Sequence, residues 1–327
     1  VKILNIPSIK ELQLSITDRL EKMIGDIEPV EPTLGFIPTE PDRLLRFLRL
    51  FAEGQHQRTM DEIGTGYANI LYIILLLLEA KQKRELSENA AMILVVEEPE
   101  AHLHPHLQRL VFTDLFDESE TNVPVLLTTH SPHITSVAPL KSLLMLQKTD
   151  AGTIGFNATD TKLTEFEIKD IERYLNVTRA ELAFSKGIIL VEGIAEVILV
   201  SEFAKKKGKP LDEFGISIIS VEGTDFKPYI KLLGSAGLNI RTAIITDGDP
   251  ITLKSGKIKK SGIKQALQVF EIMYDGKIQL ISDMSDDWIV KGLAYEGIFM
   301  GNHTLEIDLF EIGYLMDYLR VFRELGK

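Results

Sequence analysis

Four acidic residues in the second half of the chain have types and spacings that suit metal-ion chemistry. Glu192 directly follows the apolar run GIILV, and Glu196 comes four residues later. Asp247 and Asp249 flank a glycine after the apolar run AIIT, and residues two apart in an extended segment point to the same face. Two carboxylates about 4 Å apart repel by roughly 4 kcal/mol at an effective dielectric near 20, so such a cluster requires compensating cations.

Divalent cations are the compensation that this cluster predicts. Two Mg²⁺ or Mn²⁺ ions about 3.5–4 Å apart can clamp the attacking and leaving oxygens of a phosphodiester. The alternative is that these acids are ordinary turn residues in contact with water. Ordinary turn acids would explain Asp247 and Asp249 taken alone. They explain the set less well, because Glu192 follows another predicted strand of the same α/β unit.

Further charged residues follow the DGD sequence. Glu306 and Asp308 form another acidic pair two residues apart, in the stretch HTLEIDLF. The stretch LKSGKIKKSGIK is strongly basic, and it is either a loop in contact with water or a surface that holds DNA phosphates beside the metals. Its cations are Lys254, Lys257, Lys259, Lys260 and Lys264.

The first half of the chain carries a different set of residues, which suits nucleotide hydrolysis. Gly64-Thr65-Gly66 stands at the start of a long apolar segment, and a glycine turn at a helix N-terminus offers N–H groups and a positive dipole to phosphate. Glu97 and Glu98 end the apolar run ILVV, and His130 ends the next apolar run. One carboxylate can hold a magnesium-bound water, the next can polarise the attacking water, and the histidine can reach a γ-phosphate.

Three histidines follow the two glutamates and allow a second interpretation. His102, His104 and His106 alternate along the stretch EAHLHPHLQ, and imidazole is a common zinc ligand. We keep a zinc site as the alternative here, although the turn after a nucleotide-binding strand explains the segment without a metal.

The hydrophobic pattern predicts the elements that position these residues. Helices are expected over residues 8–27 and 41–53, followed by a long helix that opens at the glycine turn. The runs AMILVVEE and VPVLLTTH have strand length, are separated by a helical stretch and indicate a parallel sheet covered on both faces. The stretch around residues 150–152 predicts a hairpin, and strand–helix alternation restarts at Gly187 after a polar helical connector. We therefore predict an α/β protein with domains at 1–165 and 166–327.

Composition limits the class of protein. The 327 residues carry a net charge of −12, which argues against indiscriminate coating of nucleic acid but not against a nuclease. The absence of cysteine excludes disulfide scaffolds and favours a reducing, cytoplasmic setting. The longest apolar run, residues 70–78, is too short to cross a membrane. The chain opens VKILNIP, without an initiator methionine, and we expect a preceding segment.

In this order, the residues of the first half resemble the C-terminal part of an ABC-type ATPase. Gly64-Thr65-Gly66 matches the signature loop, ILVVEE the Walker B strand, PEAHLHP the D-loop and TTHSP the switch histidine. The resemblance makes Glu97 the residue that orients magnesium and Glu98 the catalytic glutamate. No GxxxxGK[ST] sequence occurs, so the loop that cradles ATP phosphates would precede Val1 and this chain should bind ATP poorly. Because signature loops act across a dimer, the resemblance implies a homodimer or a higher homo-oligomer formed through the ATPase part.

The second half resembles a Toprim domain, a Rossmann-like module with a parallel sheet. An ABC-type portion followed by a helical connector and a Toprim domain is similar to the OLD (overcoming lysogenization defect) family of ATP-dependent endonucleases in phage defence. That resemblance implies a two-metal DNA cleavage site, an ATPase that regulates it and, in some relatives, a helicase partner. Glu192, Asp247 and Asp249 would be catalytic, and the implied metal ligands are Glu192, Glu196, Asp247, Asp249, Glu306 and Asp308.

Two other classes of function compete with the endonuclease. An ATP-driven DNA clamp or scaffold would bind DNA without cutting it, but it has no need for mutually repelling carboxylates. A topoisomerase needs a tyrosine nucleophile, usually on a separate domain, and a primase would be expected to carry a zinc module that a chain without cysteine is poorly suited to form. We therefore predict that the chain nicks DNA with Mg²⁺ or Mn²⁺ and without ATP.

Overall fold

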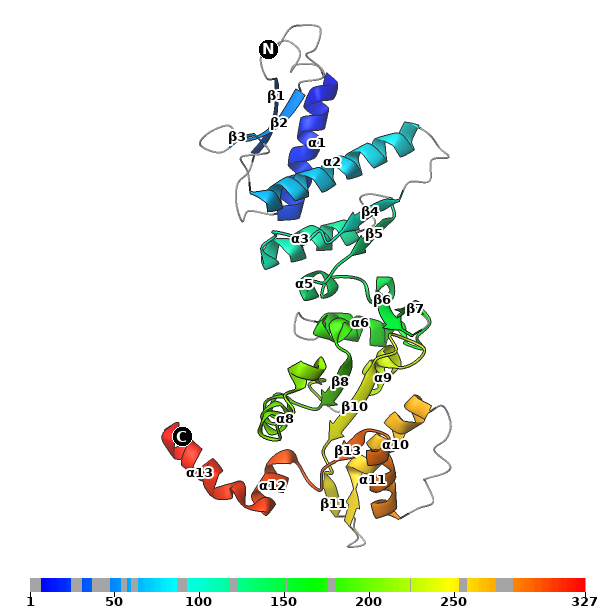
Figure 1. Ribbon diagram of the computed structural model, residues 1–327, viewed down its shortest axis with the longest axis vertical. Coiled ribbons are helices and arrows are strands. Elements are labelled where there is room, and N and C mark those ends of the chain that lie inside the picture. The colour runs from blue at the N-terminus through cyan, green and yellow to red at the C-terminus, as the bar shows by residue number, and fades with distance from the viewer. Residues whose placement is uncertain are drawn as a thin grey trace. The chain divides into compact units, whose positions relative to one another are not determined.

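The structure is a computed structural model, and its chain divides into two compact units, Val1–Pro139 and Leu140–Lys327 (Figure 1). Each unit is described by itself. The residues that the structure describes are 7–24, 31–36, 48–53, 58–59, 64–86, 93–117, 123–150, 152–175, 180–223, 225–252, 258–274 and 285–326.

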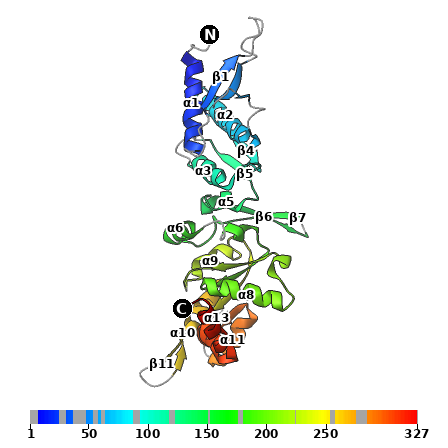
Figure 2. The ribbon, with the colours of Figure 1, turned by 90° about the vertical axis from the view of Figure 1, so that its left-hand side faces the viewer.

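The first unit combines an antiparallel sheet, a two-stranded parallel sheet and three longer helices. The strand order of the antiparallel sheet is β1-β2-β3, and α1 runs alongside β1 (Figure 2). In chain order the elements are α1 (Pro7–Ile24), β1 (Glu31–Phe36), β2 (Leu48–Glu53), β3 (Arg58–Thr59), α2 (Thr65–Leu86), β4 (Leu94–Glu97), α3 (Pro105–Phe116), β5 (Val125–Thr128) and α5 (Pro132–Thr135).

The core of the first unit lies between α1, α2 and α3. Leu20 of α1, Ile74 of α2 and Phe112 of α3 are fully buried in one hydrophobic cluster. Strands β4 and β5 pair in parallel, as predicted, and alternate residues such as Leu94 pack against this cluster. The other face differs from the expectation of a sheet covered on both sides, because Val95 is 64% exposed among the described residues.

One predicted helix of the first unit is wrong in the part that the structure describes. Residues 41–53 were expected to form an amphipathic helix, but Leu48–Glu53 is strand β2, paired antiparallel with β1. The sequence LRLFAE alternates apolar and polar residues over its first three positions, so it also satisfies a strand period, and pairing with a distant segment decides between the two periods. The rest of the predicted helix lies outside the described residues.

The second unit contains a four-stranded parallel sheet in the order β13-β10-β8-β9. Helices α9, α10 and α11 pack together on one face, and α8 lies on the other (Figure 1). The larger elements are β6 (Leu144–Thr149), β7 (Gly152–Asn157), α6 (Glu165–Tyr174), β8 (Gly187–Val191), α8 (Ile194–Lys206), β9 (Ile216–Ser220), α9 (Lys227–Leu233), β10 (Arg241–Thr246), α10 (Ser261–Tyr274), α11 (Asp286–Tyr295) and α13 (Leu315–Glu324).

Shorter elements complete the second unit. Strands β11 (Pro250–Thr252) and β12 (Ile258–Lys260) form an antiparallel hairpin after the DGD sequence. Strand β13 (Ile298–Met300) is followed by α12 (Leu305–Leu309) and a π-helical turn at Phe310–Tyr314. The predicted hairpin around residues 150–152 is confirmed as the antiparallel pair β6 and β7.

The division between the units lies upstream of the predicted boundary near residue 165. The β6–β7 hairpin and α6 belong with the second unit, because Leu140, Met145 and Ile168 pack in the same hydrophobic core as Ile188 of the parallel sheet. The connector is therefore part of a packed core instead of a linker between two cores.

In the part of the chain that the structure describes, no helix combines the length and the apolar character needed to cross a bilayer. The long apolar run belongs to α2, where Ile70, Leu71 and Ile74 are buried in the first core as predicted.

Candidate functional site

The glycine turn of the first unit opens helix α2, as predicted. Gly64 precedes the helix, Thr65 begins it, and Gly66 packs against the turn that follows β4. A Cβ atom at Gly66 would lie 2.6 Å from the carbonyl oxygen of His102, whereas a Cβ atom at Gly64 would meet nothing within 4 Å. Close backbone approach therefore requires glycine at position 66 but not at position 64.

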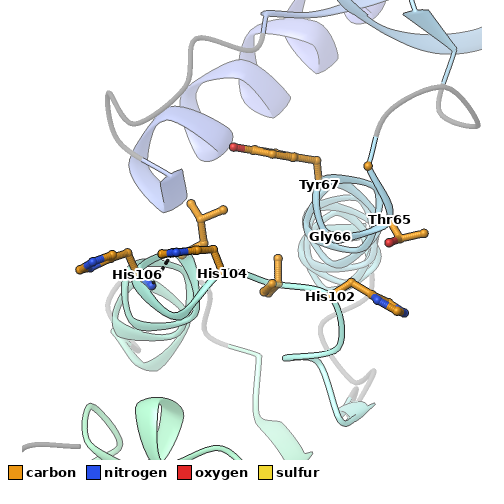
Figure 3. Close-up of a pocket in the computed structure, with 9 residues that line it drawn as sticks. Thr65, Gly66, Tyr67, His102, His104 and His106 are labelled. Carbon is orange, nitrogen blue, oxygen red and sulfur yellow. Dashed lines mark hydrogen bonds between the residues drawn. The ribbon is translucent and has the colours of Figure 1, made fainter.

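A cavity lies beside this turn, between the start of α2 and the start of α3 (Figure 3). His104 and His106 lie together at the start of α3, with ring centroids 5.4 Å apart, while His102 points away from them (Figure 3). His104 Nδ1 accepts a hydrogen bond from the His106 backbone N–H, and His106 Nδ1 accepts one from Arg109 at 2.7 Å. The imidazoles do not converge on one point, so this arrangement does not support the zinc alternative.

The acidic and histidine residues at the ends of β4 and β5 come together as predicted. Glu97 is the last residue of β4 and is paired with Thr128 of β5. Glu98 follows with a left-handed φ of 42°, and its backbone N–H donates to the Thr128 carbonyl oxygen at 3.0 Å. His130 Nε2 lies 3.5 Å from Glu98 Oε1, with side chains that are 83% and 61% exposed. A carboxylate and an imidazole thus share one open edge of the parallel sheet.

In the second unit, Glu192 links the ends of two neighbouring parallel strands. Strands β8 and β10 pair directly, so Glu192 and Asp247 follow strand ends that lie side by side. Glu192 Oε1 accepts hydrogen bonds from Thr246 Oγ1 at 2.5 Å and from the Asp247 backbone N–H at 2.9 Å. The Glu192 carboxylate is therefore held in place at the DGD loop.

Glu196 lies in the first turn of α8, next to the same strand end. Its side chain is buried, and Oε2 accepts a hydrogen bond from the Gly193 backbone N–H at 3.0 Å. The positive end of the helix dipole favours a carboxylate at this position. The predicted spacing between Glu192 and Glu196 thus brings a second carboxylate to the sheet edge.

Asp247 is the centre of the acidic cluster. Burial, which is the largest cause, and the negative charges of four neighbouring carboxylates together raise its pKa from 3.8 to about 7. Those carboxylates belong to Glu192, Glu196, Asp249 and Glu306. Carboxylate oxygens are the ligands that Mg²⁺ and Mn²⁺ prefer, so these donors fit a divalent metal site.

Asp308 takes a different position from the other predicted ligands. Its two carboxylate oxygens accept hydrogen bonds from the backbone N–H groups of Asn302 at 2.9 Å and His303 at 3.0 Å. The side chain therefore holds the turn after β13. With Glu311, Asp308 and His303 place three potential ligand atoms within 4.8 Å of one another.

That grouping is more compact than the acids around Asp247, where the described residues do not bring three ligand atoms within the same distance. We regard the Asp247 cluster as the better metal site on chemical grounds, because both Asp308 oxygens already accept hydrogen bonds from backbone amides.

Sequence reasoning missed the residues that hold the DGD loop. The Thr246 hydroxyl donates to Glu192, and the Thr246 carbonyl oxygen accepts from the Gly301 N–H at 2.9 Å. Gly248 N–H donates to the His303 carbonyl oxygen at 3.0 Å, and a Cβ atom at Gly248 would collide with the carbonyl oxygens of the turn after β13. The glycine between two aspartates was a usable signal of this close approach.

The basic stretch is described only in part. Lys254 and Lys257 lie outside the described residues, and Lys259 and Lys260 belong to β12, of which only the backbone is described. Lys264 is exposed in the first turn of α10, and Gly262 of the same helix packs directly on the Asp247 carbonyl oxygen. The role of the stretch in binding phosphates stays a prediction.

Two family matches cover the first site and the part of the second site from Glu192 to Asp249. Residues 5–135 match the AAA ATPase domain family, and residues 184–249 match the family of overcoming lysogenization defect protein-like TOPRIM domains. The matches fall within the first and second units, respectively.

Similar proteins include nucleases. The Old nuclease of Escherichia phage P2 is 26% identical over 256 residues, which are 75% of this chain and 43% of that protein. Endonuclease GajA of Bacillus cereus (strain HuB5-5) is 27% identical over 221 residues, which are 58% of this chain and 31% of that protein. The chain thus spans less than half the length of these curated relatives.

A solved structure is similar to part of the chain. The C-terminal region of the OLD protein of Xanthomonas campestris pv. campestris is 38% identical, with 44% of this chain and 63% of that chain covered and a TM-score of 0.38. The first unit thus matches an AAA ATPase domain and the second an OLD-like Toprim domain, in the order that the resemblance to the OLD family predicts.

Proposed function

We propose that this protein is a metal-dependent DNA endonuclease that hydrolyses phosphodiester bonds at the Asp247 cluster. The observation that carries the proposal is the convergence of carboxylates from the ends of β8 and β10, from α8 and from α12 on Asp247. These charges oppose one another, so a domain that only binds DNA gains nothing from keeping them together. The nuclease names of the similar proteins support the same reaction.

The metal ligands in this proposal are Glu192, Glu196, Asp247, Asp249 and Glu306. Mg²⁺ or Mn²⁺ bound there would supply Lewis-acid stabilisation of the charge that develops on the scissile phosphate. The residues of the chain orient the site. Thr246 and the Asp247 N–H fix the Glu192 carboxylate, and Asp308 fixes the turn that holds Gly248. Asp308 therefore serves the site by positioning, whether or not it also reaches a metal.

The DNA strand would approach past α10 in this proposal. Lys264 lies in the first turn of that helix, whose N-terminal residues pack on the DGD loop. The positive end of the helix dipole and the lysine both attract phosphate. The lysines of the neighbouring stretch would add further phosphate contacts.

The ATPase unit would regulate cleavage. Gly64, Thr65 and Gly66 would contact ATP as the signature loop of a homodimer, and Glu97, Glu98 and His130 would line the hydrolytic edge. The 3.5 Å approach of Glu98 to His130 supports this assignment. Phage defence and a helicase partner remain proposals that follow from the family resemblance.

The test is nicking of supercoiled plasmid by the chain and by Glu192→Ala, with Mg²⁺, Mn²⁺ or EDTA, each with and without ATP. We expect nicking that needs metal, does not need ATP and is absent in Glu192→Ala. Glu213→Gln is the matched control, because Glu213 is exposed before β9, at the opposite end of the strands. Metal-dependent nicking that survives in Glu192→Ala would refute the assignment, and DNA binding without nicking would favour a clamp.

A further inference from the structure

Glu100 joins the turn after β4 to the histidine after β5. Its Oε1 atom accepts two hydrogen bonds, from the Thr129 hydroxyl and from the His130 backbone N–H, both at 2.8 Å. The second oxygen, Oε2, is buried and accepts no hydrogen bond from the residues that the structure describes. Two short hydrogen bonds to the same oxygen atom therefore hold the backbone at His130 in place.

The segment around His130 is held from its other side as well. Thr129 Oγ1 accepts from the Ser131 N–H at 2.9 Å, and the Ser131 hydroxyl donates to Gln108 of α3 at 2.5 Å. Both Ser131 and Gln108 are buried. The backbone of the His130 segment is therefore fixed, and Glu100 is the charged group in this set of contacts.

The turn that contains Glu100 also contacts the glycine turn of α2. The carbonyl oxygen of Ala101 accepts a hydrogen bond from the Asn69 side chain at 3.4 Å, and the carbonyl oxygen of His102 lies against Gly66. A single short turn thus contacts the predicted signature loop on one side and the predicted switch histidine on the other.

We propose that Glu100 is a positioning residue for ATP hydrolysis, which holds His130 beside Glu98 and ties that position to the turn at Gly66. The proposal rests on the proposed ATPase function of the first unit. The length of the Glu100 side chain matters, because it places Oε1 where both donors, the Thr129 hydroxyl and the His130 N–H, can bind the same atom. It transfers no proton and contacts no nucleotide.

Two conservative variants separate the effect of the length of the Glu100 side chain from the effect of its charge. Glu100→Gln keeps an oxygen acceptor at the same distance from the backbone and removes the charge. Glu100→Asp keeps the charge and shortens the side chain by one methylene. A positioning role predicts that Gln preserves function and Asp does not, whereas a charge-dependent chemical role predicts the reverse.

The first measurement is hydrogen exchange of the His130 amide by NMR in this chain, which does not depend on ATPase activity. Loss of the hydrogen bond is expected to speed exchange about tenfold in Glu100→Asp and to leave it within about threefold in Glu100→Gln. Amides of β5 serve as the internal reference, and thermal unfolding confirms that each variant is folded. Unchanged exchange in Glu100→Asp would overturn the proposal.

The second measurement is steady-state ATP hydrolysis by the protein with its complete nucleotide site. We expect kcat to fall about tenfold in Glu100→Asp with KM for ATP unchanged, and both to be preserved in Glu100→Gln. Glu79→Gln is the control, because Glu79 is exposed on α2 and pairs with Lys83. Loss of kcat in Glu100→Gln with retention in Glu100→Asp would overturn the positioning role. If the unsubstituted protein hydrolyses no ATP, the ATPase proposal is refuted. The hydrogen-exchange measurement then still tests whether Glu100 binds the His130 amide.

Discussion

Asp247 should destabilise the protein in the absence of metal. In the folded state its pKa is raised from 3.8 to about 7, first by burial and then by Glu192, Glu196, Asp249 and Glu306. Between these two pH values the folded state retains a proton that the unfolded state has lost. The free energy of unfolding therefore falls as pH rises from about 4 to about 7, and the full penalty is present above pH 7. Asp247→Asn removes the charge while keeping the shape of the side chain.

The expected gain in the free energy of unfolding for Asp247→Asn follows from the raised pKa of Asp247. A pKa raised from 3.8 to about 7 corresponds to roughly 4 kcal/mol if all of it is expressed as stability. The cluster lies at a sheet edge open to water, which screens the charges, so we expect about 1–2 kcal/mol. The gain should be larger at pH 8 than at pH 5, because the folded protein still retains part of the Asp247 proton at the lower pH.

Trp288 is the sole tryptophan of the sequence and lies in α11, so its fluorescence follows unfolding of the second unit. We would measure urea unfolding of the unsubstituted protein and Asp247→Asn in EDTA at pH 5 and pH 8. Asp160→Asn is the control, because Asp160 is an exposed turn residue and should change stability by less than about 0.5 kcal/mol at both pH values. A variant that is no more stable than the unsubstituted protein at pH 8 would show that the carboxylates do not repel one another as argued.

Four further substitutions test the packing within the two units. Gly66→Ala should lower the free energy of unfolding by about 1–3 kcal/mol, since its Cβ would lie 2.6 Å from a backbone carbonyl oxygen, whereas Gly64→Ala should be tolerated. Thermal unfolding compares the two variants, and equal effects would contradict the close contact at Gly66. Arg19→Met should cost about 3 kcal/mol in urea unfolding, because it removes the buried guanidinium that lies 2.7 Å from the partly buried Asp114 carboxylate. A loss below about 1 kcal/mol would contradict this. Gly248→Ala should abolish metal-dependent nicking by displacing the DGD loop, and full activity would show that the loop adapts.

Much of the candidate metal site could be predicted from the sequence, because apolar runs of strand length indicate where parallel strands end. GIILV and AIIT became β8 and β10, and their pairing brings Glu192 beside Asp247. The helix that follows β8 begins at Ile194, so Glu196 lies in its first turn. Local patterns thus indicate where each strand ends, and the pairing of β8 with β10 brings the two ends together.

Other features depended on contacts between distant segments, and sequence patterns could not supply them. Leu48–Glu53 fits both a helix and a strand period, and pairing with β1 made it a strand. Asp308 was predicted as a metal ligand, which stays a prediction, and the sequence did not indicate that its carboxylate also binds the turn after β13 through two backbone N–H groups. The connector joined the second core because Ile168 is buried in the same hydrophobic cluster as Ile188, which polarity alone did not indicate.

The two sites differ in how they hold their charged groups, and this difference bears on how each would work. In the second unit, backbone N–H groups bind the carboxylates of Glu192 and Glu196, so the repelling charges are held in place within one unit. In the first unit, Glu98 and His130 are 61% and 83% exposed, and water weakens any electrostatic effect between them. Hydrolysis there would need another surface to exclude water, as homodimer formation around ATP would do. The metal site needs no such cover to be assembled, which is why we expect nicking without ATP.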